Sequence, residues 1–207
     1  IGLLKEVGIN PIVVHGGGPQ IGEMLKKKNI KSDFIEGLRV TDSETVKIVE
    51  EVLAKEINTK IVSDINATGG KAKGLPGHQQ GLISAEKLEI MSDESDSNIE
   101  KLLDLGFVGK PTDIDSIIIE KTISDGLIPV IAPLGRDKKN NIYNINADTA
   151  AGVIAGAMKA SKLLLLTDVA GILDENSNLI SLLSVNEAKQ IIYKDYISGG
   201  MKPKIET

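Results

Sequence analysis

The chain has 207 residues, no cysteine and only 2% aromatic residues, with a formal net charge of −5 at pH 7. This mild acidity and the scarcity of stacking side chains argue against a nucleic-acid partner, and small molecules or other proteins are expected instead. The absence of cysteine excludes disulfides and thiolate sites. No signal peptide or membrane-length apolar run occurs, so we expect a cytoplasmic protein without a membrane partner. A plastid or mitochondrial matrix protein without its transit peptide is the alternative.

The first third of the chain alternates short strands with helices. Residues 12–15 form a β-branched strand, and the helix that follows opens at Pro19, a residue favoured at the first helical position. Residues 33–40 are strand-like. A long helix is predicted over residues 44–67, because apolar side chains recur there every three or four positions.

The rest of the chain also alternates predicted strands with predicted helices. We predict edge hairpins over 70–112 (with a solvated loop at 92–96), helices over 114–124, 148–160 and 185–193, and buried strands over 128–133 and 162–166. Strands that are continuous apolar runs and alternate with helices are typical of a mainly parallel sheet covered on both faces. The predicted fold class is therefore α/β.

Three consecutive glycines, Gly16, Gly17 and Gly18, separate the first strand from its helix. Because glycine is costly to order, such a run indicates that something approaches the backbone closely. A strand, glycines and a helix N-terminus direct backbone N–H groups at an anion. Neither the Walker lysine nor the dinucleotide glycine spacing is present. An anion site is predicted, and a plain tight connection is the alternative.

A candidate substrate-binding side chain lies in the segment "GLRVTD". Arg39 faces opposite Leu38 and Val40 in an extended segment, where it could clamp a carboxylate with both ends of its guanidinium. The alternative is an arginine that simply faces water.

Polar residues alternate in "YNINADTAA", just before a predicted helix. Asn144 and Asn146 could form a polar wall for a ligand. Asp148 could take part in the same site or cap the helix.

Two later segments carry further polar groups. Thr167 and Asp168 follow four leucines, at the strand end where open α/β sheets bind ligands, although an ordinary strand exit has the same composition. Lys202 and Lys204 follow a glycine pair and could neutralise phosphate charge, or could serve only solubility.

Together these segments resemble one family. "VVHGGGPQI", "GLRVTD", "IPVIAPLG", "YNINADTAA", "LLLLTDVAGIL" and "GGMKPKIE" are similar to the acetylglutamate kinases of the amino acid kinase superfamily, in this order through essentially the whole chain. The resemblance implies a three-layer αβα sandwich with a mainly parallel sheet. It also implies ATP-dependent phosphorylation of the side-chain carboxylate of N-acetyl-L-glutamate, a step of arginine biosynthesis.

The resemblance implies a domain organisation and partners as well. A single amino acid kinase domain would cover residues 1–207, with 1–145 mainly binding N-acetylglutamate and 146–207 mainly binding ATP. Mg²⁺ would accompany ATP and be held mainly by its phosphates, without a dedicated metal site in the protein. A homodimer or higher homo-oligomer is expected.

Residue roles follow from the resemblance. The backbone of Gly16 and Gly17 would hold the transferring phosphoryl group, Arg39 the substrate α-carboxylate, and Asn144 the acetamido end. Asp148 would organise the catalytic lysines, and Lys204 would stabilise charge on the phosphates. The nucleotide would be bordered by Thr167, Asp168, Val169, Ala170, Gly171, Ile172, Tyr196, Ile197 and Ser198.

The two histidines have no acid–base task in this chemistry. A carboxylate is already a nucleophile at neutral pH, so catalysis needs positioning and charge neutralisation rather than a general base. His15, next to the glycines, is therefore expected to be structural, and His78 has no evident role.

Some features depart from the family pattern. The family begins with a strand that carries a lysine before glycines and continues past Lys204, so we expect a chain truncated at both ends and poorly active as it stands. "GLPGHQQG" has His-Gln-Gln where a Lys-Asp pair is common. Related kinases acting on aminoadipate, glutamate or aspartate, and a non-catalytic amino-acid-sensing homologue, are the alternatives.

Overall fold

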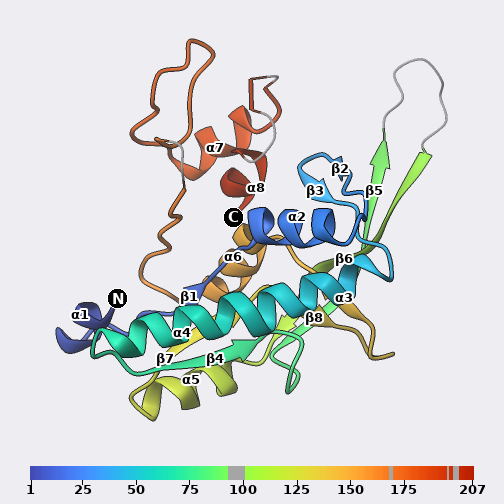
Figure 1. The fold of residues 1–207 in the computed structure, drawn as a ribbon. Coiled ribbons are helices and arrows are strands. Elements are labelled where there is room, and N and C mark those ends of the chain that lie inside the picture. Colours follow the sequence, from blue (N-terminus) through green and yellow to red (C-terminus); the bar gives the residue numbers. More distant parts are fainter. Residues whose placement is uncertain (93–100, 168–169, 195, 198–200) are drawn as a thin grey trace.

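A three-stranded parallel sheet forms the centre of the computed structural model, which describes residues 1–92, 101–167, 170–194, 196–197 and 201–207 (Figure 1). Its strands are β1 (Val13–Val14), β7 (Ile128–Ala132) and β4 (Ala72–Pro76), with β7 in the middle. Every residue of β7 is buried, as its continuous apolar run predicts.

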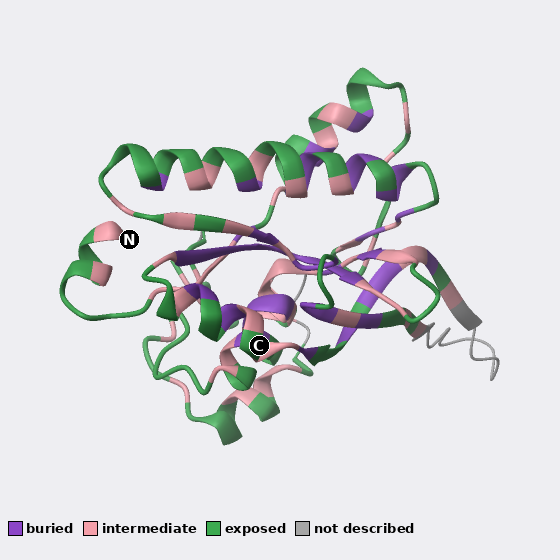
Figure 2. Ribbon diagram, turned by 90° about the horizontal axis from the view of Figure 1, so that it is seen from below, coloured by how far each residue is buried: buried purple, intermediate pink, exposed green. Residues whose placement is uncertain are grey.

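Helices cover both faces of this sheet. Among the described residues, η1 (Glu51–Ile57), α4 (Asn58–Ala67), α5 (Ser116–Ser124) and α6 (Ala147–Ala157) contact the strands of the sheet. The other helices are α1 (Gly2–Glu6), α2 (Gly18–Lys27), α3 (Thr45–Glu50), α7 (Val185–Ile191) and α8 (Met201–Glu206). The elements α3, η1 and α4 run on without a break as the predicted long helix, whose buried residues lie on the side facing the sheet (Figure 2).

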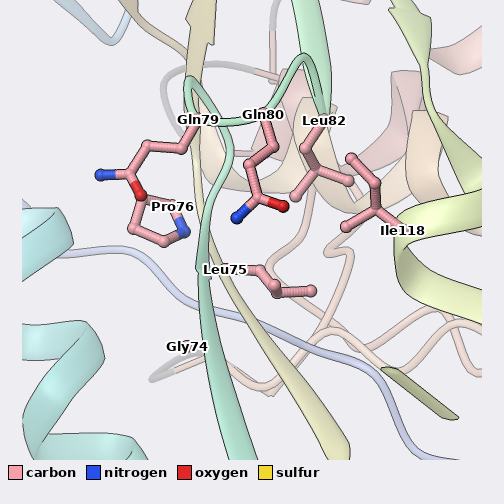
Figure 3. Close-up of a pocket in the computed structure, with 7 residues that line it drawn as sticks. All are labelled: Gly74, Leu75, Pro76, Gln79, Gln80, Leu82 and Ile118. Atoms are coloured by element: carbon pink, nitrogen blue, oxygen red, sulfur yellow. The ribbon is translucent and has the colours of Figure 1, made fainter. Parts of the chain in front are cut away.

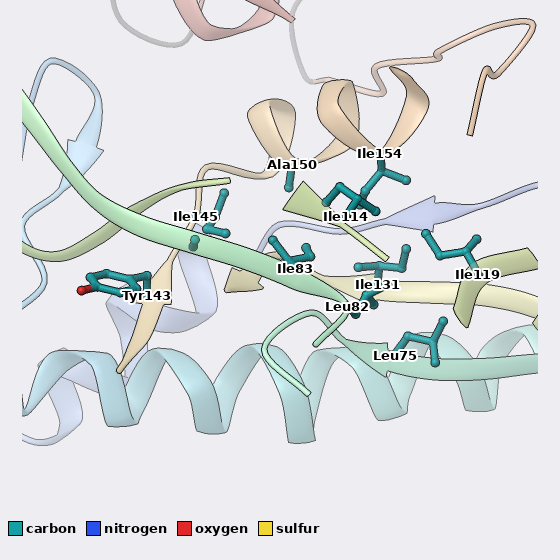
Figure 4. Close-up of a cluster of buried hydrophobic side chains, with 11 residues drawn as sticks. Leu75, Leu82, Ile83, Ile114, Ile119, Ile131, Tyr143, Ile145, Ala150 and Ile154 are labelled. Atoms are coloured by element: carbon teal, nitrogen blue, oxygen red, sulfur yellow. The ribbon is translucent and has the colours of Figure 1, made fainter. Parts of the chain in front are cut away.

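The side chains of β7 alternate between the two helical layers. Val130 packs with Ile65 of α4 on one face, whereas Ile131 belongs to the cluster that includes Ile119 of α5 and Ile154 of α6 (Figure 4). Because successive strand residues point to opposite faces, the sheet that contains β7 is the middle layer of an αβα sandwich. The predicted α/β class with a mainly parallel sheet is confirmed.

The remaining strands make two smaller sheets. β5 (Ile83–Ser92), β6 (Lys101–Ile114), β8 (Leu134–Arg136) and β9 (Ile142–Asn144) close into a small barrel. β2 (Phe34–Ile35) and β3 (Leu38–Arg39) form a hairpin, so residues 33–40 are two short strands rather than one. Glu36 and Gly37, both at positive φ, make the tight turn between them.

Two further expectations need correction. The region 70–112 was expected to contain only edge hairpins, yet β4 is a parallel strand of the central sheet. The strand predicted over 162–166 is wrong, because the structure assigns no strand there and Leu166 is 94% exposed. Leucines form a buried strand only where a neighbour takes their backbone hydrogen bonds, and none of the strand pairings among the described residues includes residues 162–166.

Gly106 of β6 offers a test of this packing. It has φ +71°, and a Cβ there would lie 2.2 Å from the carbonyl oxygen of Thr41. Gly126 has a similar φ of +77° with no atom within 4 Å of the added Cβ. We expect Gly106→Ala to lower the free energy of unfolding by about 2 kcal/mol more than Gly126→Ala, which carries only the backbone strain. Urea unfolding of both variants measures the difference, and equal losses would contradict the packing described.

Candidate functional site

A cavity of about 200 Å³ lies where the chain leaves β1 and β7. Its walls come from the glycine loop Gly16–Gly18, from Phe34 and Arg39 of the β2–β3 hairpin, from Pro133 after β7, and from residues 144–147 at the start of α6. The carboxyl ends of parallel strands are the usual binding edge of α/β sheets. Segments far apart in the sequence thus share one pocket.

The glycine loop packs tightly against the long helix. A Cβ on Gly17 would lie 2.5 Å from Ile57 Cδ1 and 2.6 Å from Leu53 Cδ2. A side chain on residue 17 would have to displace these two side-chain ends, so close packing favours glycine here, whereas its φ of −178° is ordinary extended backbone. Gly17 is the N-cap of α2, and the first N–H groups of a helix have no acceptor within the helix. The loop can present these donors to an anion.

Arg39 is buried beside this loop. It is 8% exposed, and its Nη2 donates to the Gly18 carbonyl oxygen at 3.0 Å while Nη1 donates to Ser32 Oγ. The guanidinium carbon lies 4.5 Å from the centre of the Phe34 ring. Burial lowers the pKa of Arg39, yet a guanidinium stays charged at neutral pH. The alternative of an arginine that simply faces water is wrong.

Asn144, at the end of β9, also lines the cavity. Its Nδ2 donates to Thr41 Oγ1 at 3.3 Å, and the Thr41 hydroxyl donates to the Arg39 carbonyl oxygen at 2.8 Å. Thr41 is fully buried. This chain of hydrogen bonds connects the two predicted substrate-binding residues.

Asp148 is paired with Lys204. Asn146 caps α6 by accepting from the Thr149 N–H at 3.0 Å, so the reading of Asp148 as the helix cap is wrong. Instead Lys204 Nζ donates to Asp148 Oδ2 at 2.7 Å, with both side chains about one quarter exposed. Gly152 allows α8 to approach α6, because a Cβ there would lie 2.7 Å from Thr207 Cγ2.

The predicted nucleotide-binding residues lie outside the lining of this cavity where they are described. Asp168, Val169 and Ser198 fall outside the described residues. Ala170 is exposed, Gly171 and Ile172 start a loop closed by the hydrogen bond from Ile180 N–H to the Ile172 carbonyl oxygen, and Ile197 is buried. All the predicted nucleotide-binding residues, including Thr167 and Tyr196, remain predictions.

The sequence reasoning missed the surroundings of both histidines. His78 is 2% exposed, and its Nε2 lies 3.2 Å from Glu50 Oε1. Burial lowers the pKa of His78, partly opposed by Glu50. Next to it in sequence, Pro76, Gln79 and Gln80 border a hollow of about 30 Å³ (Figure 3). This hollow has room for about one water molecule and is too small for a substrate.

The pKa values of His15 and His78 predict a pH effect on stability. Burial lowers both pKa values below the ordinary 6.5, so the unfolded chain binds more protons than the folded one at pH below about 6.5. The two neutral histidines make their full contribution to the free energy of unfolding above that pH. This contribution falls as the pH decreases, by up to about 1.4 kcal/mol per pH unit for each histidine. Urea midpoints at pH 7.5, 6.5 and 5.5 measure this, and a flat profile would contradict the buried neutral state.

Comparison with known proteins decides the family. The model of the amino acid kinase family matches residues 1–207. The chain belongs to the amino acid kinase family.

Curated members of this family are close in sequence. Acetylglutamate kinase of Gluconobacter oxydans is 55% identical over 207 residues, covering 100% of this chain and 70% of the relative. Acetylglutamate kinase of Afipia carboxidovorans is 53% identical over 205 residues, with 99% and 70% covered. The resemblance stated from the sequence is confirmed.

Solved structures agree on the fold. The protein smu.665 of Streptococcus mutans has a TM-score of 0.84 at 29% identity, covering 98% of this chain and 77% of that one. N-acetylglutamate synthase of Neisseria gonorrhoeae, complexed with coenzyme A and N-acetyl-glutamate, has a TM-score of 0.79 at 20% identity, with 99% and 44% covered. The second likeness shows the amino acid kinase fold alone.

The described residues contain no group of three or more His, Asp or Glu side chains arranged to hold a metal ion. No helix in the described part of the chain is long and apolar enough to cross a membrane.

Proposed function

We propose that this chain transfers the γ-phosphoryl group of ATP to the side-chain carboxylate of N-acetyl-L-glutamate, the acetylglutamate kinase step of arginine biosynthesis. The observation that carries the proposal is one cavity lined by the glycine loop, Arg39 and Asn144 together. Identity of 53–55% to acetylglutamate kinases over nearly the whole chain supports it.

The reaction suits a site without a general base. A glutamate side-chain carboxyl has an ordinary pKa near 4.3 and is ionised at neutral pH, so its oxygen attacks the γ-phosphorus directly. A bond from this oxygen to phosphorus forms, and the bond from phosphorus to the β,γ-bridging oxygen breaks, with its electron pair leaving on ADP. Positioning and charge neutralisation supply the rate enhancement.

The cavity residues divide the recognition of the two reactants. The N–H groups at Gly16 and Gly17 face the transferring phosphoryl group. Arg39 holds the substrate α-carboxylate, which suits a guanidinium with a fixed fork of donors. Asn144 contacts the acetamido end.

The charged pair at α6 and α8 serves the nucleotide side. Lys204 neutralises charge on the phosphates, and Asp148 directs its ammonium group, consistent with their 2.7 Å contact. Mg²⁺, when bound with ATP, is held mainly by the phosphates and neutralises further charge. Residues 1–145 mainly bind the acylamino acid and residues 146–207 mainly bind ATP.

The proposal extends to the cellular location and the assembly of the protein. We assign the enzyme to the cytoplasm, which fits a chain without cysteine. A homodimer or higher homo-oligomer is the proposed assembly.

A substrate panel tests the proposal in the complete protein. ADP release is measured with N-acetylglutamate, glutamate, aspartate and aminoadipate at equal concentrations. We expect kcat/KM for N-acetylglutamate to exceed the others by about 100-fold or more, because a substrate that leaves buried polar groups unpaired is strongly rejected. No turnover with N-acetylglutamate would refute the assignment. In that case, calorimetry measures the binding of the amino acid with and without nucleotide. A non-catalytic amino-acid sensor would bind the amino acid without nucleotide.

A further inference from the structure

A buried polar pair, His15 and Asn58, lies behind the glycine loop. Their exposed fractions are 8% and 3%. Asn58 Nδ2 lies 3.1 Å from His15 Nε2 and 2.9 Å from the Val130 carbonyl oxygen. His15 Nδ1 lies 3.0 Å from the Gly16 carbonyl oxygen. The pair thus connects α4 and β7 to the first glycine of the loop.

These contacts determine where the protons are. A carbonyl oxygen only accepts, so His15 Nδ1 donates to Gly16 and the Asn58 amide nitrogen donates to Val130. The second N–H of Asn58 then points at His15 Nε2, which must accept. A neutral imidazole with its proton on Nδ1 satisfies all three contacts, whereas an imidazolium would set two donors against each other. Burial, which lowers the pKa of His15, favours the same neutral form.

The fold leaves room for Asn58 in this orientation. A Cβ on Gly74 of β4 would lie 2.2 Å from Asn58 Oδ1, so a side chain there would displace the amide. All three strands of the central sheet therefore surround the pair: His15 follows β1, Val130 is in β7 and Gly74 is in β4.

The hydrogen bond to Gly16 fixes a peptide group of the loop. A peptide unit is planar and trans, so the Gly17 N–H points opposite to the Gly16 carbonyl oxygen. That oxygen is turned to the imidazole, and His15 is not among the residues lining the cavity, whereas Gly16 and Gly17 are. We propose that His15 and Asn58 are positioning residues that turn the Gly17 N–H toward the cavity.

This inference rests on the proposed function, because the donor it orients is the one assigned to the transferring phosphoryl group. Two substitutions of His15 test the hydrogen bond to Gly16 separately from the contact with Asn58. In His15→Asn, the amide Nδ2 can replace Nδ1 and keep the bond to Gly16. In His15→Gln, the longer amide can replace Nε2 and keep the contact with Asn58, but the bond to Gly16 is lost.

The test compares these two variants in the complete protein. We expect His15→Gln to lower kcat with N-acetylglutamate by about 10- to 100-fold, since one misdirected donor to a charged transition state has effects of this size. His15→Asn should recover kcat to within about 5-fold of the wild type. KM for N-acetylglutamate should change by less than about 3-fold in both, because Arg39 and Asn144 are untouched.

A purely structural role gives a different result. The loss of kcat would then follow the melting temperature, and His15→Asn would be no better than His15→Gln; either outcome overturns the proposal.

NMR spectroscopy tests the same proposal without a measurement of turnover. Nitrogen-15 NMR of the imidazole at pH 7.5 should find Nδ1 protonated and Nε2 unprotonated, and the Gly17 amide resonance should shift in His15→Gln more than in His15→Asn. The opposite tautomer overturns the proposal. If the wild type fails to phosphorylate N-acetylglutamate, the proposed function is refuted, and these two resonances still decide whether the pair orients the peptide.

Discussion

Replacement of Lys204 by methionine is expected to lower kcat by about 100- to 1,000-fold, with little change in KM for N-acetylglutamate. The methionine keeps the length of the side chain and removes its charge, so the negative charge that spreads over the transferring phosphoryl oxygens loses a counter-charge. Steady-state kinetics with saturating ATP measure the effect in the complete protein.

Lys202 provides the matched control. It lies two residues earlier in α8 and is exposed, whereas Lys204 is half-buried against Asp148. Lys202→Met should keep kcat within about 2-fold, because an exposed charge is well screened. Equal losses in the two variants would mean that the Asp148–Lys204 contact has no special role in catalysis.

Replacement of Arg39 by lysine should raise KM for N-acetylglutamate by about 30- to 100-fold. Lysine keeps the positive charge but cannot donate two parallel hydrogen bonds to a carboxylate, and it also loses the contact with the Phe34 ring. The loss of a buried charge-assisted pair accounts for about 2–3 kcal/mol of binding.

The KM for ATP serves as the internal control for this variant. Because Arg39 lies on the hairpin side of the cavity, the KM for ATP should change by less than about 2-fold. A variant that weakens ATP and N-acetylglutamate binding alike would instead indicate that Arg39 holds the glycine loop through its bond to the Gly18 carbonyl oxygen.

The sequence predicted those elements whose signal is local. The long helix ending at Ala67 and the buried strand at 128–132 follow from periodicity and continuous apolar runs. The β4 strand was missed because Lys73, Gly74 and Pro76 hide it. The leucines at 163–166 gave a strand signal that the fold does not use, because a strand also needs a neighbour.

Contacts across long sequence separations were beyond such reasoning. Asp148 and Lys204 are 56 positions apart and meet only because α8 packs on α6. The resemblance assigned both residues to one site, but only the fold shows the ion pair. Nothing local distinguishes Asn58 within its helix, since its two hydrogen-bond partners, His15 and the Val130 carbonyl oxygen, come from other elements.

Under the proposed function, a carboxylate receives the phosphoryl group in this cavity. Hydroxylamine traps an acyl phosphate as a hydroxamate, so the complete protein is incubated with ATP, Mg²⁺ and N-acetylglutamate, and hydroxamate and ADP are both measured. We expect one hydroxamate for each ADP, and loss of both products in Lys204→Met. Trapping also releases one inorganic phosphate for each hydroxamate, so the decisive contrary result is ADP release without hydroxamate.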